Sequence, residues 1–208
     1  MSTFEEIKQY LPQYLSSGSQ KTLFRDLEQF PQNIDKRFYS QGSLSDVNYF
    51  QGDGVKDVFC INLPSADIRP APVVLLSNSC DLDQANERFA PLSAIYTPVF
   101  NLEKYKNALE KSGIDQERVN THVANIKKQQ VSHIFYLPKN EQLTYDAIIF
   151  LDKINHISAS ELYKKPASEK RIFSLGNLGF YVFLVKLSIH FTRIREGLDR
   201  SAPQLLAS

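Results

Sequence analysis

The stretch that decides the fold covers residues 51–100 and opens with QGDGVKDVFCINL (51–63). It continues with PSADIRPAP (64–72), VVLLSNSCD (73–81) and, after a short gap, LSAIYTPVF (92–100). Short apolar runs bounded by Gly, Pro and polar clusters are typical of β-strands. The order predicts a strand, a polar loop with Arg69 before Pro70, a buried strand, a turn and another strand.

Further strands are expected downstream, after a helical interruption. The segments LEKYKNALEKSG (102–113) and DQERVNTHVANIKKQQ (115–130) have helical patterns, with Gly113 as a stop and Asp115 as an N-cap. Strand patterns return at SHIFYLP (132–138) and YDAIIFLDKINHIS (145–158), and a short turn is expected at 158–163. A last strand and a closing helix follow within 171–198. We interpret 101–130 as a helical insertion between strands.

The N-terminal part is predicted to be a helical hairpin. Apolar residues recur at helical spacing in two runs, separated by SSGSQ (16–20), and Pro31 ends the second run. The predicted organisation is a helical extension at 1–45 and a mainly β domain, with added helices, at 46–200.

Composition limits the classes of function. The chain has 208 residues, and 24 Lys and Arg against 23 Asp and Glu give a formal net charge of +1. A nucleic-acid surface would therefore have to be a local patch, which counts against RNA as the ligand. The most basic segments contain Lys164, Lys165, Lys170 and Arg171, and Arg193 and Arg195.

No cofactor or metal is expected. The two cysteines, Cys60 and Cys80, and the histidines at 122, 133, 156 and 190 have no metal-ligand spacing, and phosphate-loop and esterase motifs are missing. The start of the chain does not resemble a signal peptide, and the apolar segment 178–191 is too short to span a bilayer. These features predict a cytoplasmic protein with reduced thiols and no membrane partner.

The order of the strands, the Gly52-Asp53 pair and the Arg69-Pro70 step before VVLLSN resemble the MazF/PemK toxin family over about 51–100 and 131–195. The resemblance implies an SH3-like small β-barrel with a C-terminal closing helix. It also implies a bacterial endoribonuclease of a toxin–antitoxin or phage-defence system, with RNA, an antitoxin and a second copy in a homodimer as partners. Such enzymes need no metal, because the ribose 2′-hydroxyl attacks the adjacent phosphorus.

The family's catalytic Arg and Thr map onto Arg69 and Thr97, with Ser93 as a weaker alternative to Thr97. A guanidinium suits this role because it can donate two hydrogen bonds to two phosphate oxygens at once and stays charged. The alternative interpretation is a solvated surface Arg and a Thr that merely ends a strand.

The SNSCD segment (77–81) departs most from the toxins. It ends an apolar strand and would project towards the ligand face, so we expect Ser77, Asn78 and Asp81, with Ser93, to bind substrate. Cys80 could be a nucleophile, but the neighbouring carboxylate would raise its pKa. The alternative is that Cys80 is a small buried residue and that Asn78 and Asp81 bond turn amides.

Two hypotheses follow. The chain is a diverged endoribonuclease that uses Arg69 and Thr97, or it is a catalytically inactive barrel that binds a protein or nucleic acid. Fold alone does not decide between them.

Overall fold

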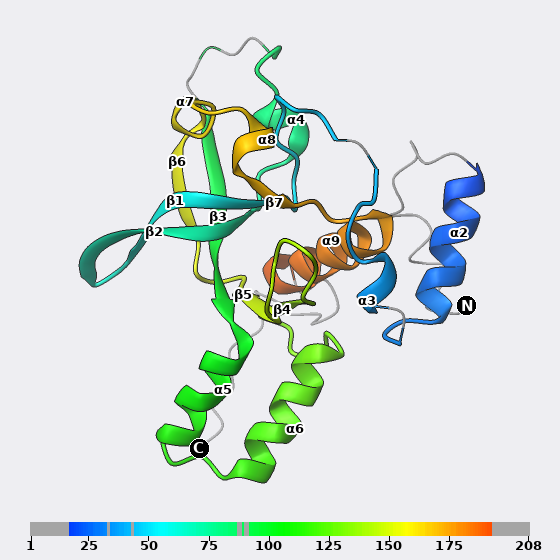
Figure 1. Ribbon diagram of the computed structural model, residues 1–208, viewed down its shortest axis with the longest axis vertical. Helices are drawn as coiled ribbons and strands as arrows, with labels where there is room; N and C mark the ends of the chain where they lie inside the picture. Colours follow the sequence, from blue (N-terminus) through cyan, green and yellow to red (C-terminus); the bar gives the residue numbers. More distant parts are fainter. Residues whose placement is uncertain (1–16, 33, 43, 87–88, 90–91, 193–208) are drawn as a thin grey trace, which may run out of the picture.

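The computed structural model describes residues 17–32, 34–42, 44–86, 89 and 92–192 (Figure 1). The strands are β1 (Gly54–Asn62), β2 (Ser65–Leu75), β3 (Ser93–Asn101), β4 (Ile134–Leu137), β5 (Ala147–Phe150), β6 (Asn155–Ser158) and β7 (Arg171–Phe173). The helices are α2 (Ser17–Glu28), α3 (Ile34–Arg37), α4 (Ser79–Leu82), α5 (Leu102–Lys111), α6 (Gln116–Lys127), α7 (Ala159–Leu162), α8 (Ala167–Lys170) and α9 (Asn177–Thr192).

The fold is α+β, as predicted, and is built on one seven-stranded antiparallel sheet. The strand order is β4-β5-β3-β2-β1-β7, and β6 also pairs with β3. Within the described residues, the two end strands β4 and β7 do not pair with each other, so the sheet is open. The predicted barrel closure is therefore not confirmed.

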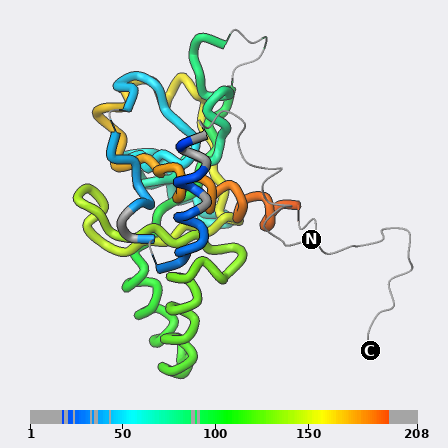
Figure 2. The backbone as a smooth tube through the Cα atoms, turned by 90° about the vertical axis from the view of Figure 1, so that its right-hand side faces the viewer, coloured from blue at the N-terminus to red at the C-terminus, as the bar shows by residue number. Residues whose placement is uncertain are grey.

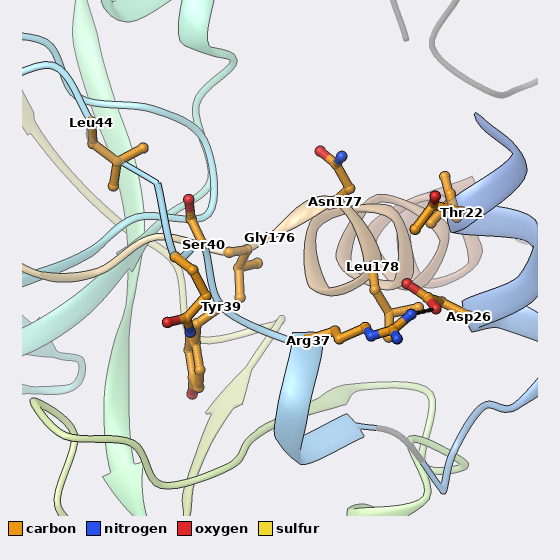
Figure 3. A pocket seen from close by; sticks show the side chains of 12 residues that line it. Thr22, Asp26, Arg37, Tyr39, Ser40, Leu44, Gly176, Asn177 and Leu178 are labelled. Atoms are coloured by element: carbon orange, nitrogen blue, oxygen red, sulfur yellow. Dashed lines mark hydrogen bonds and ion pairs between the residues drawn. The ribbon is translucent and has the colours of Figure 1, made fainter. Parts of the chain in front are cut away.

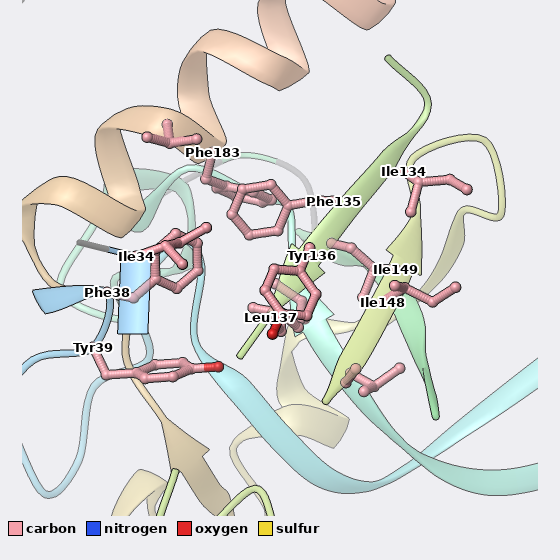
Figure 4. Close-up of a cluster of buried hydrophobic side chains, with 14 of the residues drawn as sticks. Ile34, Phe38, Tyr39, Ile134, Phe135, Tyr136, Leu137, Ile148, Ile149 and Phe183 are labelled. Carbon is pink, nitrogen blue, oxygen red and sulfur yellow. The ribbon is translucent and has the colours of Figure 1, made fainter. Parts of the chain in front are cut away.

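Side chains on opposite faces of β2 enter two separate cores. Val74 belongs to the larger core, whereas Val73 and Leu75 belong to the smaller one, as expected from the two-residue period of a strand. In the larger core Phe135 stacks on Phe38 at 5.6 Å and meets Phe183 of α9 at 5.1 Å between ring centroids. Figure 4 shows these rings converging from the end of α3, from β4 and from α9.

The two helices predicted at 101–130 are present and lie between β3 and β4. The Asn101 side chain accepts a hydrogen bond from the Lys104 amide at the start of α5, and Asp115 caps α6 as predicted. Gly113, between the helices, has φ +85°, a conformation that favours glycine. Figures 1 and 2 show the α5–α6 pair projecting away from the sheet.

The N-terminal prediction is partly wrong. Helix α2 begins at Ser17, so residues 17–20 are helical and do not form the predicted break. The first predicted helix falls on residues 1–16, outside the described part of the chain. At the other end, β7 and α9 occur where the last strand and the closing helix were predicted.

A buried ion pair joins the start of β1 to β7. Arg171 donates to the Asp53 carboxylate at 2.8 Å, and its other nitrogens donate to the Ser45 and Asn48 carbonyls. Asp53 also accepts from the Phe50 amide and the Ser174 hydroxyl, and none of Asp53 is exposed. Burial raises the pKa of Asp53, while the bonds from Ser174, Phe50 and Arg171 oppose that shift.

Among the described residues, side chains rather than a further strand cover the free edge of β4. Gln129, with φ +59°, accepts from the Tyr136 amide at 3.1 Å and donates to the Tyr136 carbonyl at 2.7 Å. Buried Lys186 of α9 donates to Gln129 Oε1 at 3.1 Å, to the Val131 carbonyl at 2.7 Å and to the Ile134 carbonyl. The junction between the helical pair and the sheet is therefore held by α9.

Candidate functional site

The segment predicted as a polar loop around Arg69 is a strand, and this prediction was wrong. Residues 65–72 belong to β2, which pairs with β1 in a long hairpin with Cys60 opposite Arg69 and Ile61 opposite Ile68. Cross-strand pairing outweighs the low strand propensity of a Pro- and Asp-containing sequence, because it satisfies the backbone groups of both strands. Figure 1 shows the hairpin extending beyond the rest of the sheet.

The two faces of the hairpin differ in character. Val58 and Cys60 face the smaller core, so Phe59 and Ile61 point outward with their partners Pro70 and Ile68. Phe59 is 61% exposed, Ile68 is 62% exposed, and Leu63 at the turn is 76% exposed. The outward face, which we call the hairpin patch, consists of Phe59, Ile61, Leu63, Ile68 and Pro70.

Side chains from the sheet anchor the outer edge of β1. The Tyr96 hydroxyl donates to the Phe59 carbonyl, and Asn155 Oδ1 accepts from the Ile61 amide at 2.7 Å. Tyr96 and Asn155 are themselves opposite each other in the β3–β6 pairing. Side chains of two neighbouring strands therefore hold the hairpin in place.

The other edge of the hairpin, along β2, is protected by proline. Pro70 and Pro72 are two residues apart, so their backbone nitrogens face the same edge, and neither can donate a hydrogen bond. Phe59, which is opposite Pro70, turns its carbonyl toward Tyr96 and away from β2. In an antiparallel pair the Pro70 nitrogen therefore also turns away from β1, toward the free side. Addition of a partner strand at this edge is disfavoured.

The structure does not bring the predicted catalytic residues together. Arg69 is exposed and pairs with Asp67 at 3.1 Å. It lies on the same face of β2 as Val73, whereas Thr97 is opposite Val74 and faces the other side of the sheet. Thr97 is fully buried, and its hydroxyl donates to the Phe150 carbonyl at 2.8 Å.

Of the predicted substrate-binding residues, Ser77 and Ser93 lie at the start of β3, and Asn78 and Asp81 belong to α4. Buried Ser77 accepts from the Ile95 amide at 2.8 Å, and exposed Ser93 is two residues away on the same strand as Ile95. Asn78 caps α4 by accepting from the Cys80 amide at 2.9 Å, and exposed Asp81 lies in the first turn of that helix. The observed bonds of Ser77 and Asn78 stabilise the turn.

The two cysteines differ in their surroundings. Cys60 lies half-buried in the hairpin, and burial raises the pKa of its thiol to about 11, which disfavours the thiolate. Cys80 is exposed, contrary to the interpretation of it as a buried residue. The described residues contain no group of three or more His, Cys, Asp or Glu that could hold a metal ion.

A second group of aromatic and basic side chains is centred on Phe150 and was not predicted. Tyr105 of α5 contacts the Phe150 ring at 5.6 Å between centroids, and its hydroxyl lies 3.1 Å from His122 Nε2 of α6. His133 stacks on Phe150 at 6.4 Å, and Lys153 Nζ lies 5.8 Å from the ring centre. Apart from Phe150 and Lys153, which share one turn, these residues are far apart in sequence and share no motif, so the fold brings them together. We call this group the Phe150 cluster.

A pocket of about 470 Å³ lies between α2, the end of α3 and the start of α9 (Figure 3). The Arg37–Asp26 ion pair forms one wall, and Ser40, Gly176 and Asn177 form part of another. Asp26 is buried and Arg37 is half-exposed. The pair bridges α2 and α3 and thereby helps to position both helices against α9.

Comparisons with known families and with curated proteins find no match to this chain. In the described part of the chain, every helix lacks either the length or the apolar character needed to cross a membrane.

Proposed function

We propose that this chain is a diverged MazF/PemK-like binding module that does not cleave RNA with Arg69 and Thr97. The observation that carries the proposal is the placement of these two residues on opposite faces of the sheet, with the Thr97 hydroxyl occupied by the Phe150 carbonyl. A catalytic pair must reach the same phosphate, and these side chains diverge. In this proposal the open sheet is an altered SH3-like barrel, enlarged by the α5–α6 pair.

The binding element in this proposal is the hairpin patch. Exposed apolar side chains gathered on one face mark protein-contact surfaces more often than isolated exposed residues do. The neighbouring Asp67–Arg69 pair neutralises its own charge, so the hairpin lacks the basic character that a nucleic-acid surface needs. A protein with an apolar surface is the partner that fits.

The edges of the hairpin define how such a partner would bind. The β2 edge carries Pro70 and Pro72, and on the β1 edge Phe59 and Ile61 already bond to Tyr96 and Asn155. Pairing with another strand is therefore disfavoured, and contact would be made by side chains of the patch. This partner could be an antitoxin-like protein of a bacterial defence operon or a second copy of the chain. The proposal assumes a reducing cytoplasm, in which Cys60 and Cys80 stay thiols.

A double substitution of the patch tests this proposal. We expect Phe59→Ser with Ile68→Ser to abolish co-purification of a stoichiometric protein partner from the source organism, while the variant stays folded. The matched control is Val47→Ser, since Val47 is 57% exposed but lies outside the patch. Light scattering of the purified chain alone measures its molecular mass. A dimer mass identifies the partner as a second copy, and a monomer mass identifies it as a different protein.

Two outcomes would count against the proposal. One is a partner that remains bound to the double variant as tightly as to the control. The other is an exclusively monomeric chain that co-purifies with nothing in stoichiometric amount.

A further inference from the structure

The Phe150 cluster combines an aromatic surface with three nitrogen-bearing side chains that can carry positive charge. Phe150 and His133 are near parallel, with an interplanar angle of 27°, and both are partly exposed. Lys153, in the turn after β5, is exposed and lies beside the ring. His122 is partly exposed on α6.

The histidines are near enough to influence each other. Burial, and then the charge of His133, lower the pKa of His122. Burial also raises the pKa of Tyr105, so its hydroxyl remains a neutral hydrogen-bonding group beside His122. The cluster therefore has one imidazole, one ammonium and one phenol around the Phe150 ring, and a second imidazole, His122, bonded to that phenol.

The basic side chains of this cluster stand apart from the ion pairs found among the described residues. The ion pairs of the described residues involve other lysines and arginines, and none joins Lys153, His122 or His133 to Asp or Glu. Elsewhere on the same helical pair, Lys106 faces Glu110 and Lys127 pairs with Asp146 at 2.7 Å. The Lys153 ammonium is thus available to an anion, whereas His122, with its lowered pKa, offers a hydrogen bond rather than a charge.

We propose that the Phe150 cluster binds a nucleotide, with its flat base against Phe150 and His133, and with its phosphate held by the Lys153 ammonium and hydrogen-bonded by the neutral His122 imidazole. Aromatic side chains stack on any base because each base has a π-face, and adjacent cations hold the phosphate. The shared chemistry is a planar ring that carries a phosphate, whether as a free nucleotide or within a single strand. This site is distinct from the hairpin patch and does not depend on the proposed protein docking.

The test is an NMR titration of the full chain that follows the ring signals of His122 and His133. AMP is expected to shift both sets of signals saturably, whereas adenosine and inorganic phosphate bind about tenfold more weakly, because each lacks one of the two recognised parts. A short single-stranded oligonucleotide is titrated in parallel. Tighter binding of the oligonucleotide identifies a strand as the source of the nucleotide, and tighter binding of AMP identifies the free form.

Variants make the assignment specific. Lys153→Gln is expected to weaken AMP binding by about tenfold, as loss of a charged phosphate contact would. Lys104→Gln, an exposed lysine on α5 that is not in the cluster, leaves binding unchanged. The proposal is overturned if neither AMP nor the oligonucleotide moves the histidine signals. It is also overturned if inorganic phosphate binds as well as AMP, or if both lysine variants behave alike.

Discussion

Replacing Asp53 by alanine is expected to lower the free energy of unfolding by about 3–5 kcal/mol, the range for breaking one side of a buried ion pair. The substitution leaves the Arg171 guanidinium almost fully buried, with the Ser45 and Asn48 carbonyls and the Phe50 ring as its remaining partners among the described residues. It also removes the acceptor of the Phe50 amide and of the Ser174 hydroxyl. Most of the loss comes from the guanidinium charge, which stays buried without its counter-ion.

The chain contains a matched control for this experiment. Asp67 and Arg69 also form an ion pair, at 3.1 Å, but their side chains are 69% and 79% exposed. Asp67→Ala should therefore change the unfolding free energy by no more than about 1 kcal/mol. Chemical denaturation of both variants at one pH measures the difference. Equal losses of unfolding free energy in the two variants would show that the buried Asp53–Arg171 pair does not stabilise the fold more than an exposed pair does.

The second large effect concerns Lys186 and pH. Burial lowers the pKa of Lys186 to about 7, from the ordinary value of 10.5 in an exposed chain. Between these two values the unfolded chain binds a proton that the folded chain does not, so stability rises with pH across this window. Below about pH 7 both states are protonated, and this group contributes no further slope.

The expected size follows from the linkage relation. One pKa unit corresponds to about 1.4 kcal/mol, so Lys186 adds about 2–3 kcal/mol of stability between about pH 7 and pH 9. Lys186→Met should remove this increment, whereas Lys139→Met, at an exposed position, should keep it. Urea denaturation of the native chain and of both variants, at about pH 7 and about pH 9, gives the change in unfolding free energy with pH for each protein. A slope that is unchanged by Lys186→Met would contradict the lowered pKa.

The local signals in the sequence predicted the helical pair well. Asp115 favours a helix start because its side chain caps the first turn, and Gly113 favours a helix end because it adopts a positive φ. Both effects are local to one turn of helix. The fold class and the closing helix were also predictable, because long apolar runs specify buried elements whatever their partners are.

The errors have a common physical origin in long-range contacts. The residues around Arg69 have turn-like composition, and only pairing with β1 makes them a strand. The placement of Thr97 depends on the register between β2 and β3, where a shift by one residue moves a side chain to the other face. The Phe150 cluster unites residues from α5, α6, β5 and two turns, so no sequence window contains it.

The most direct measurement of the proposed function is incubation of a long mixed-sequence RNA with the purified chain, without metal, at high protein excess. We expect intact RNA with the native chain and with Arg69→Ala, because Arg69 and Thr97 cannot act on the same phosphate. Discrete fragments with 2′,3′-cyclic phosphate ends, lost in Arg69→Ala, would contradict the proposal and establish a toxin-type ribonuclease.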